Sequence, residues 1–186
     1  MVTPPQMPVA DRRVQRTRWG LIDAFLTLLQ SRSWDELSVS EICEYANVGR
    51  STFYAHFNSK EDLVAARFEA LKQQLLASEG TRAAGPLPFL PGLLQHAEDN
   101  REVFQAIVGQ RSGEVIHEHL RLVVLYLVRS VLGSQTPAGE CLDWAVHFVA
   151  GGVLETLTWW LRAGAHEPAE DVNRRLQVFA ARALTK

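Results

Sequence analysis

The residues with the most specific chemistry lie in one short stretch near the front of the chain. Phe53 and Phe57 are spaced by one helical turn, so both rings can pack into a core from the same face of a helix. Around them remains an outward surface of hydrogen-bond donors and small groups: Arg50, Ser51, Thr52, Tyr54, Ala55 and His56. An arginine guanidinium donates two parallel hydrogen bonds, and hydroxyl groups suit single acceptor oxygens. The stretch therefore offers recognition by hydrogen bonding.

Residue patterns of enzyme and metal sites are not found in the sequence. His117 and His119 are two residues apart, whereas a helical zinc site needs histidines four residues apart. Neither a glycine-rich phosphate loop nor a nucleophile elbow is present. Cys43 and Cys141 have no basic neighbour in sequence, which favours packed thiols over redox sensors. We expect a non-enzymatic protein with no metal or other cofactor.

Composition narrows the class of protein. The 186 residues are 47% hydrophobic and 22% charged, which is typical of a globular chain. The net charge of −2 argues against a bulk basic protein that coats nucleic acid, although a local basic patch remains compatible with it. Two cysteines and no visible secretory signal favour a cytoplasmic protein. The apolar stretch 145–161 contains His147, two glycines and Glu155, so a buried helix or subunit interface is favoured over a membrane span.

The elements that must position these residues are helices. Apolar residues recur with helical spacing almost throughout, and no sustained alternation indicates a strand. Ser38 and Glu41 form a capping-box pattern that starts a short helix over 39–46. Asn47 tolerates the left-handed turn that ends it, and Gly49 can cap the next helix, 50–56. Residues 39–56 therefore predict a helix-turn-helix with Ile42, Cys43 and Ala46 on its inner face.

The rest of the chain divides at a proline-rich segment, 80–92, where Pro88 could open the following helix. Later helices are expected at about 101–108, 114–132, 138–163 and 169–184, with Gly133 and Gly164 as stops and Pro168 opening the last. The predicted fold is all-α, with an N-terminal helix-turn-helix unit and a C-terminal helical bundle. Its expected parts are a disordered arm (1–11), a three-helix unit (12–58), a connecting helix (59–79) and the bundle (86–186).

The stretch from Ser38 to Leu63 resembles the signature of TetR-family transcriptional regulators. Its most specific part is Thr-Phe-Tyr-x-His-Phe at 52–57, followed by Lys-Glu-Asp-Leu at 60–63. The resemblance covers roughly residues 13–71, under half of the chain. Two positions depart from the family pattern. Asn47 replaces a glycine that it can mimic, and Gly49 replaces a serine, which weakens the cap and puts one phosphate contact in doubt.

The resemblance implies which residues face DNA. Carried over, the set is Arg50, Ser51, Thr52, Tyr54 and His56, with Lys60, Ser38, Ser40 and Arg18 in support. Arg50 corresponds to a frequent base reader, while Tyr54 and Lys60 correspond to phosphate contacts. The alternatives are a structural His56, a solvated Lys60 and a packed Tyr54. The arginine-rich segment 12–18 either follows the DNA backbone or is a solvated tail.

The resemblance also implies a homodimer on palindromic DNA, regulated by a small-molecule effector in the bundle. Candidate interface residues lie on the last two long helices: Val149, Gly152, Val153, Leu157, Trp160, Leu176 and Phe179. Candidate effector contacts are aromatic and polar residues, for which core packing is the alternative: His96, Phe104, His117, Tyr126, Trp144, His147, Phe148 and Trp159. Gly151 and Gly152 allow close helix approach.

The sequence thus predicts a DNA-binding transcriptional regulator, with repression as the expected mode and no membrane association. Effector binding would favour a state whose recognition helices are wrongly spaced. One alternative is a helical small-molecule-binding protein whose DNA-binding unit has decayed. A helical enzyme that uses the bundle cavity is a third possibility, although no residue constellation predicts it.

Overall fold

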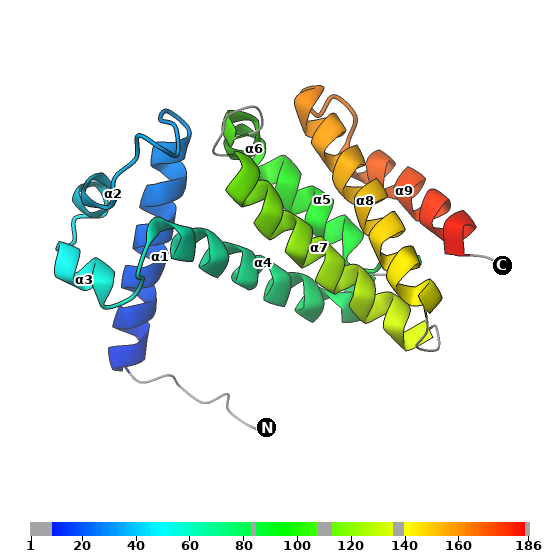
Figure 1. Cartoon of the computed structure of the whole chain (residues 1–186), viewed down its shortest axis with the longest axis horizontal. Helices are drawn as coiled ribbons and strands as arrows, with labels where there is room; N and C mark the ends of the chain where they lie inside the picture. The colour runs from blue at the N-terminus through cyan, green and yellow to red at the C-terminus, as the bar shows by residue number, and fades with distance from the viewer. Residues whose placement is uncertain (1–8, 83–84, 108–112, 136–139, 185–186) are drawn as a thin grey trace.

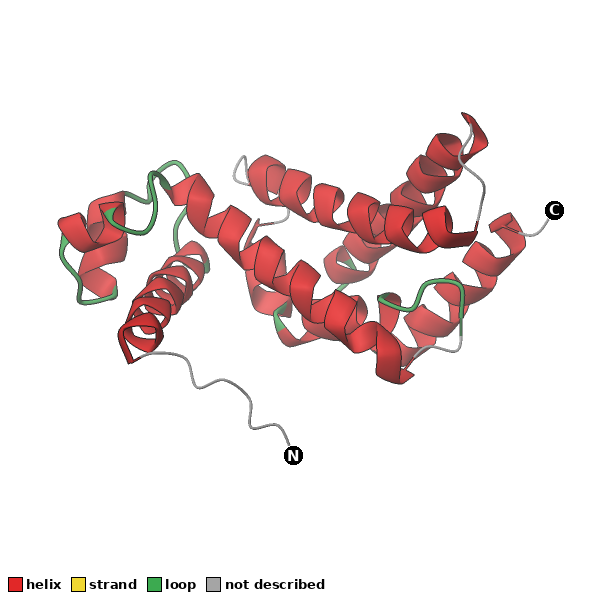
Figure 2. Ribbon diagram, turned by 90° about the horizontal axis from the view of Figure 1, so that it is seen from below, coloured by secondary structure: helices red, strands yellow, loops and turns green. Residues whose placement is uncertain are grey.

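The structure is a computed structural model that describes residues 9–82, 85–107, 113–135 and 140–184. The described residues form helices and connecting loops, with no strand among them (Figures 1 and 2). The helices of these segments are α1 (Val9–Leu29), α2 (Val39–Tyr45), α3 (Arg50–Tyr54), α4 (Lys60–Arg82), α5 (Leu90–Asp99), α6 (Arg101–Ile107), α7 (Gly113–Gln135), α8 (Glu140–Arg162) and α9 (Ala169–Leu184). The predicted all-α fold class is confirmed.

Helices α1 to α3 gather at one end of the molecule, and α5 to α9 form a bundle at the other (Figure 1). Helix α4 starts beside the first group and runs along the bundle, where it packs on α7. Within the bundle, α7 packs along α8 and α5 packs against α9. Helix α1 contacts both α4 and α6, so the two ends of the molecule share a packed junction.

The short helices α2 and α3 are fixed by local signals in the sequence. The backbone of Asn47 has a φ of 52°, and the Val48 amide donates to the Cys43 carbonyl over 2.9 Å, which ends α2. Gly49 then caps α3 in an extended conformation without a side-chain hydrogen bond. Both residues therefore have the roles predicted for the turn.

The apolar sides of these helices meet in a shared core. Ile42 and Phe53 are fully buried, and Cys43 and Phe57 are each 3% exposed. Phe25 of α1 meets the ring of Trp34 edge to face, with 5.7 Å between the ring centres. Because α2 and α3 are too short to be stable alone, this burial is what holds them in place.

Several boundaries differ from the sequence prediction. Helix α5 begins at Leu90 with Pro91, not Pro88, in its first turn, where a missing amide hydrogen is tolerated. Helix α7 continues through Gly133 to Gln135, because packing of the neighbouring Val131 and Leu132 outweighs the low helix propensity of one glycine.

The ends of two other helices can be compared with the sequence. Helix α1 already contains residues 9–11, which had been assigned to the arm, whereas residues 1–8 lie outside the described residues. Helix α8 ends before Gly164, whose φ is +87°, as predicted. Among the described helices, none combines the length and apolarity needed to cross a bilayer.

Candidate nucleic-acid interface

The exposed face of α3 carries most of the predicted donor set. Arg50, Ser51 and Tyr54 are exposed, and Thr52 is half-buried. The fully buried Phe53 fixes the opposite face of the helix. The helix thus presents one guanidinium and the hydroxyl groups of Ser51 and Tyr54 to solvent while its apolar side stays in the core.

Tyr54 is oriented by its neighbour. Its ring meets that of Phe53 edge to face at 5.3 Å between centres, and the residue is still 51% exposed. Packing of one ring edge restricts the rotamer, so the phenol group extends from the surface in a defined direction. This arrangement argues against the alternative of a packed Tyr54 and suits contact with an external acceptor.

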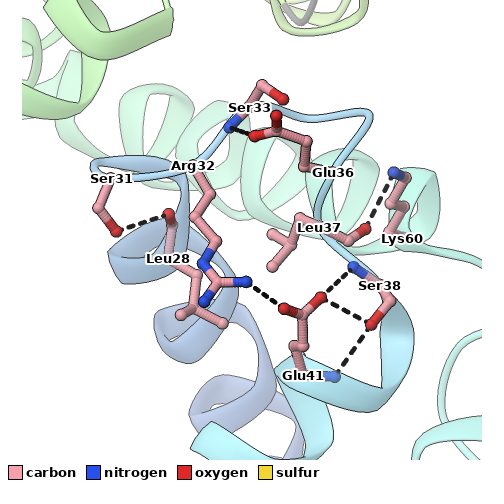
Figure 3. Close-up of polar contacts among 9 residues, drawn as sticks. All are labelled: Leu28, Ser31, Arg32, Ser33, Glu36, Leu37, Ser38, Glu41 and Lys60. Atoms are coloured by element: carbon pink, nitrogen blue, oxygen red, sulfur yellow. Dashed lines mark hydrogen bonds and ion pairs between the residues drawn. The ribbon is translucent and has the colours of Figure 1, made fainter.

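Ser38 is engaged at the start of α2 (Figure 3). Its hydroxyl oxygen accepts from the Glu41 amide over 3.3 Å, and the Glu41 carboxylate accepts from the Ser38 amide over 2.9 Å. The Ser38 hydroxyl also donates to that carboxylate over 2.8 Å. These bonds from Ser38 and the charge of Arg32, which is ion-paired with Glu41, lower the pKa of the Glu41 carboxyl group. The capping box is as predicted, and it occupies the Ser38 hydroxyl.

Ser40 is the second residue of α2, two positions after Ser38, and it is exposed. Its side chain lies at the positive end of the helix dipole, which favours an anion. Of the two serines predicted to contact phosphate, Ser40 is therefore the better placed, because Ser38 already uses its donor within the cap.

Lys60 stands at the first position of α4 and reaches back to the loop before α2 (Figure 3). Its Nζ donates to the carbonyl oxygens of Trp34 and Leu37 over 2.5 and 3.1 Å. The ammonium also lies 4.8 Å from the centre of the Trp34 ring. Lys60 is therefore not a freely solvated lysine, and at most one of its three donors remains for a phosphate.

Arg18 ties α1 to the end of the helix-turn-helix. Its guanidinium donates to the backbone carbonyl of His56 over 3.0 Å and lies 4.5 Å from the centre of the Phe57 ring. His56 is half-buried and lines a hollow between α1 and α4 together with Arg18. This geometry favours structural roles for both residues.

Cys43 is a buried free thiol, 3% exposed. Burial raises its pKa, and the positive charge of Arg50 opposes that shift. A packed structural thiol fits these surroundings better than a redox sensor. The side chain of Cys141 lies outside the described residues. No group of three or more potential metal ligands of the His, Cys, Asp or Glu type occurs in the described part of the chain.

In the bundle, a small cavity lies where α1, α4, α5, α6 and α7 meet. Of the predicted effector contacts, His96 and Phe104 line it. The others do not: His117 is exposed, Tyr126 is 50% exposed against Lys72, and Trp144, His147, Phe148 and Trp159 of α8 face solvent. Arg67 and Asn100 also line the cavity and were not identified from the sequence, although an arginine beside Phe68 on an apolar face is a usable signal.

The predicted dimer residues divide into two sets. Val149, Val153, Leu157, Trp160 and Leu176 are at most 7% exposed and pack inside this chain. Gly152 and Phe179 are exposed and line an open groove along α8 and α9. The aromatic residues Phe148 and Trp159 are 73% and 59% exposed on the same helix, α8. Val149, Val153 and Leu176 also line the groove along α8 and α9, so five of the seven predicted interface residues border it.

Comparison with known proteins identifies the family. Residues 21–66 match the model of bacterial regulatory proteins of the tetR family, and residues 86–182 match a transcriptional regulator C-terminal region. The chain belongs to the TetR family. The resemblance found in residues 38–63 is thereby confirmed. The family is one of transcriptional regulators, which are not enzymes, and the prediction of a non-enzymatic protein is confirmed on that ground.

Individual TetR-family relatives are moderately similar. The chain is 29% identical to the transcriptional regulator TcmR of Streptomyces glaucescens over 136 residues, 70% of this chain and 56% of TcmR. It is 32% identical to the dhaKLM operon activator DhaS of Lactococcus lactis over 84 residues, 45% of this chain and 44% of DhaS. The chain thus spans 56% or less of the length of these two relatives.

Solved structures show the same fold. A TetR regulator from Streptococcus agalactiae superposes with a TM-score of 0.67 at 27% identity, covering 92% of this chain and 97% of that one. RolR in complex with resorcinol has a TM-score of 0.55 at 21% identity, covering 92% and 93%. Both likenesses extend over the helix-turn-helix unit and the bundle, so the arrangement in Figure 1 is that of the TetR family.

Proposed function

We propose that this protein is a sequence-specific DNA-binding transcriptional regulator that reads DNA with α3. The observation that carries the proposal is the exposed set of Arg50, Ser51 and Tyr54 on a helix anchored by the fully buried Phe53, within a chain of this family. In this reading residues 12–58 form the DNA-binding unit, 59–79 the connecting helix and 86–186 the regulatory bundle. Such a regulator acts in the cytoplasm, where bacterial DNA lies.

The residues divide into base readers and phosphate contacts. Arg50 is proposed to donate two hydrogen bonds to guanine in the major groove, which specifies sequence. Tyr54, Ser40 and the free donor of Lys60 are proposed to contact phosphates, which fix position without reading sequence. Ser51 and Thr52 are proposed to contact either bases or phosphates. His56 and Arg18 are proposed to stabilise the end of the helix-turn-helix through the hydrogen bond from the Arg18 guanidinium to the His56 carbonyl.

We propose a homodimer, because one short recognition helix reads too few base pairs for a specific site. The surface proposed for the contact is the groove along α8 and α9 with Phe148, Gly152 and Phe179. Gly151 and Gly152 lie inside α8, where each glycine lowers helix stability by roughly 1 kcal/mol. A β-carbon added at either position would meet nothing within 4 Å in this chain. Close approach by a second copy is what would explain these two glycines.

The proposed mode is repression of a palindromic operator, relieved by a small-molecule effector. DhaS, by its name, is an activator, and a reporter gene placed behind the selected operator distinguishes repression from activation by this protein. An effector that binds one conformation better shifts the population toward it. In this reading, the effector changes the spacing of the two α3 helices and DNA is released.

Selection of bound sequences from random duplex DNA by the purified chain, at two salt concentrations, tests the proposal. A recovered palindrome with half-sites about 34 Å apart, one helical turn, supports a dimeric sequence-specific regulator. Retention of DNA without a motif, lost as salt rises, contradicts sequence-specific recognition. No retention even at low salt would indicate a small-molecule-binding protein with a decayed DNA-binding unit.

A further inference from the structure

The cavity between the DNA-binding end and the bundle is lined by both apolar and polar side chains. Most of its wall is apolar and comes from the four helices α1, α4, α6 and α7: Phe25, Leu26, Val64, Phe68, Leu71, Val103, Phe104 and Ile116. Three polar side chains, Arg67, His96 and Asn100, face the same space. An apolar cavity with a few convergent polar groups is the usual form of a small-molecule site.

Arg67 is a half-buried cation without an ion pair in the described structure. Among the described residues, no carboxylate oxygen lies within 4.0 Å of its guanidinium nitrogens. Burial lowers the pKa of Arg67, and only the more distant charge of Asp23 on α1 opposes that effect. A desolvated cation of this kind gains most from an anion that enters the same low-dielectric space.

The contact that Arg67 does make is with a neutral group. Its Nη2 lies 3.4 Å from Nε2 of His96, and Asn100 holds His96 from the other side, with its Nδ2 3.3 Å from Nδ1. Burial and then the charge of Arg67 lower the pKa of His96 to about 4, so the imidazole carries no charge near neutral pH. The cluster therefore has one uncompensated positive charge, directed at an apolar cavity.

We propose that this cavity takes a small organic acid, whose carboxylate pairs with Arg67 while its apolar body lies among Phe25, Phe68 and Phe104. The inference rests on the proposed function, because it names the effector class of the proposed regulator. A guanidinium and a carboxylate form two parallel charge-assisted hydrogen bonds, which a neutral amide cannot reproduce. Asn100 holds His96 in place next to Arg67, because its Nδ2 also donates to the His96 carbonyl oxygen over 2.8 Å.

The cavity is small, so a ligand that binds in it must move the helices around it. Its volume is about 40 Å³, whereas ordinary ligand pockets have about 300–1,000 Å³. An acid larger than a few water molecules must therefore push the walls apart. Two of the walls are α1 and α4, which carry the helix-turn-helix, so opening the cavity displaces the DNA-binding end relative to the bundle. The effector would thereby act on DNA binding directly at the junction.

The test compares acids with neutral molecules of the same shape on the full chain without DNA. The probes are benzoate, phenylacetate and hexanoate, each paired with its amide, measured by calorimetry and by thermal unfolding. We expect at least one acid to bind and to raise the melting temperature, with its amide at least tenfold weaker. Equal binding of acid and amide overturns the proposal. So does the absence of binding by any acid at 10 mM, a concentration that corresponds to a binding free energy of about 2–3 kcal/mol.

Variants then locate the site. Arg67→Gln should weaken acid binding at least tenfold, and Arg67→Lys should retain part of the preference for acid over amide. Arg101→Gln removes the same charge from an exposed position on α6 and should leave binding unchanged. Unchanged acid binding in a folded Arg67→Gln protein overturns the proposal. If Arg67→Gln does not fold, the acid and amide comparison on the native chain still decides.

Failure of the proposed function is distinguishable from failure of this inference. Direct binding of acids is measured without DNA, so it does not depend on an operator. A chain that binds acids but no DNA sequence would refute the regulator and retain the acid site. A chain that binds an operator and is released by neutral amides as readily as by acids would refute the acid site alone.

Discussion

The ammonium of Lys60 lies 2.5 Å from the carbonyl oxygen of Trp34 and 4.8 Å from the centre of the same residue's ring. One side chain thus holds both the backbone and the ring of a residue 26 positions earlier. Through this contact the start of α4 is fixed to the loop between α1 and α2. The helix-turn-helix is therefore attached to α4 at two places, by the chain itself and by Lys60.

We expect Lys60→Met to lower the free energy of unfolding by about 1–3 kcal/mol, because the carbonyls of Trp34 and Leu37 lose a charged donor. Urea denaturation measures this loss, and Lys60→Arg, which keeps the charge, is the control. If Lys60 also contacts a phosphate, the slope of log DNA affinity against log salt concentration should be smaller by about one in Lys60→Met. A Lys60→Met protein as stable as the native chain would refute the structural role.

Substitutions of Arg50 and Tyr54 are expected to change DNA binding in different ways. Arg50→Ala should cost about 1–3 kcal/mol on the selected operator and relax preference at one position of each half-site. Tyr54→Phe keeps the ring contact with Phe53 and removes only the hydroxyl, so binding to all sequences should weaken alike, by about 1 kcal/mol. Competition binding on matched operator variants measures both. An Arg50→Ala protein with unchanged sequence preference would contradict the assignment of Arg50 as base reader.

Two helical glycines allow a matched test of the dimer surface. Gly152 of α8 lies in the proposed interface groove and Gly133 of α7 lies outside it, and an added β-carbon meets nothing within 4 Å at either. We expect Gly152→Arg to give monomers and Gly133→Arg to give the same dimer as the native chain. Light scattering coupled to gel filtration distinguishes the two. A dimeric Gly152→Arg protein would exclude this groove as the interface.

The depressed pKa of His96 predicts how stability depends on pH. It lies at about 4 in the folded chain, against 6.5 ordinarily, so the unfolded chain binds more protons between these values. This contribution to stability is complete above about pH 6.5 and is lost as the pH falls toward 4, with Arg67 and Asp99 as the nearest charges. Between pH 7 and pH 5 the native chain should lose about 2 kcal/mol more than His96→Gln.

Urea denaturation at the two pH values measures the difference. The His96→Gln chain is the reference because it shares every carboxylate of the native chain. Equal losses in the two chains would show that His96 does not titrate in this way.

The parts of the site that sequence could predict are those fixed by neighbours in the chain. The Ser38–Glu41 box, the left-handed Asn47 and the buried Phe53 depend on residues within one or two turns. The contacts of Lys60 with Trp34 and of Arg67 with His96 bridge 26 and 29 positions. Periodicity shows that such residues share a helix face but not what that face meets.

The proposed dimer surface on α8 shows the same limit. Helix α8 is apolar on more than one side, so spacing alone could not separate the side that enters the chain's own core from the side that is left exposed. Leu157 and Trp160, each 1% exposed, lie on the side that enters the core, whereas Phe148 and Trp159 lie on the exposed side. Only the positions of α7 and α9 decide between them, and these are set by the tertiary fold.

Helix α4 has 23 residues and is about 35 Å long. One end is clamped to the DNA-binding unit by Lys60, and Arg67 lies about two turns further along it. Since a helix is stiff over this length, α4 would behave as a lever whose fixed end lies in the bundle and whose moving end is at Lys60, with the cavity nearer the moving end. A rotation of about 10° about the bundle end would move the Lys60 end by about 6 Å, a sizeable fraction of a helical turn of DNA. Ångström-scale adjustments among the side chains that line the cavity would thereby change the register of the proposed DNA-binding unit on the duplex.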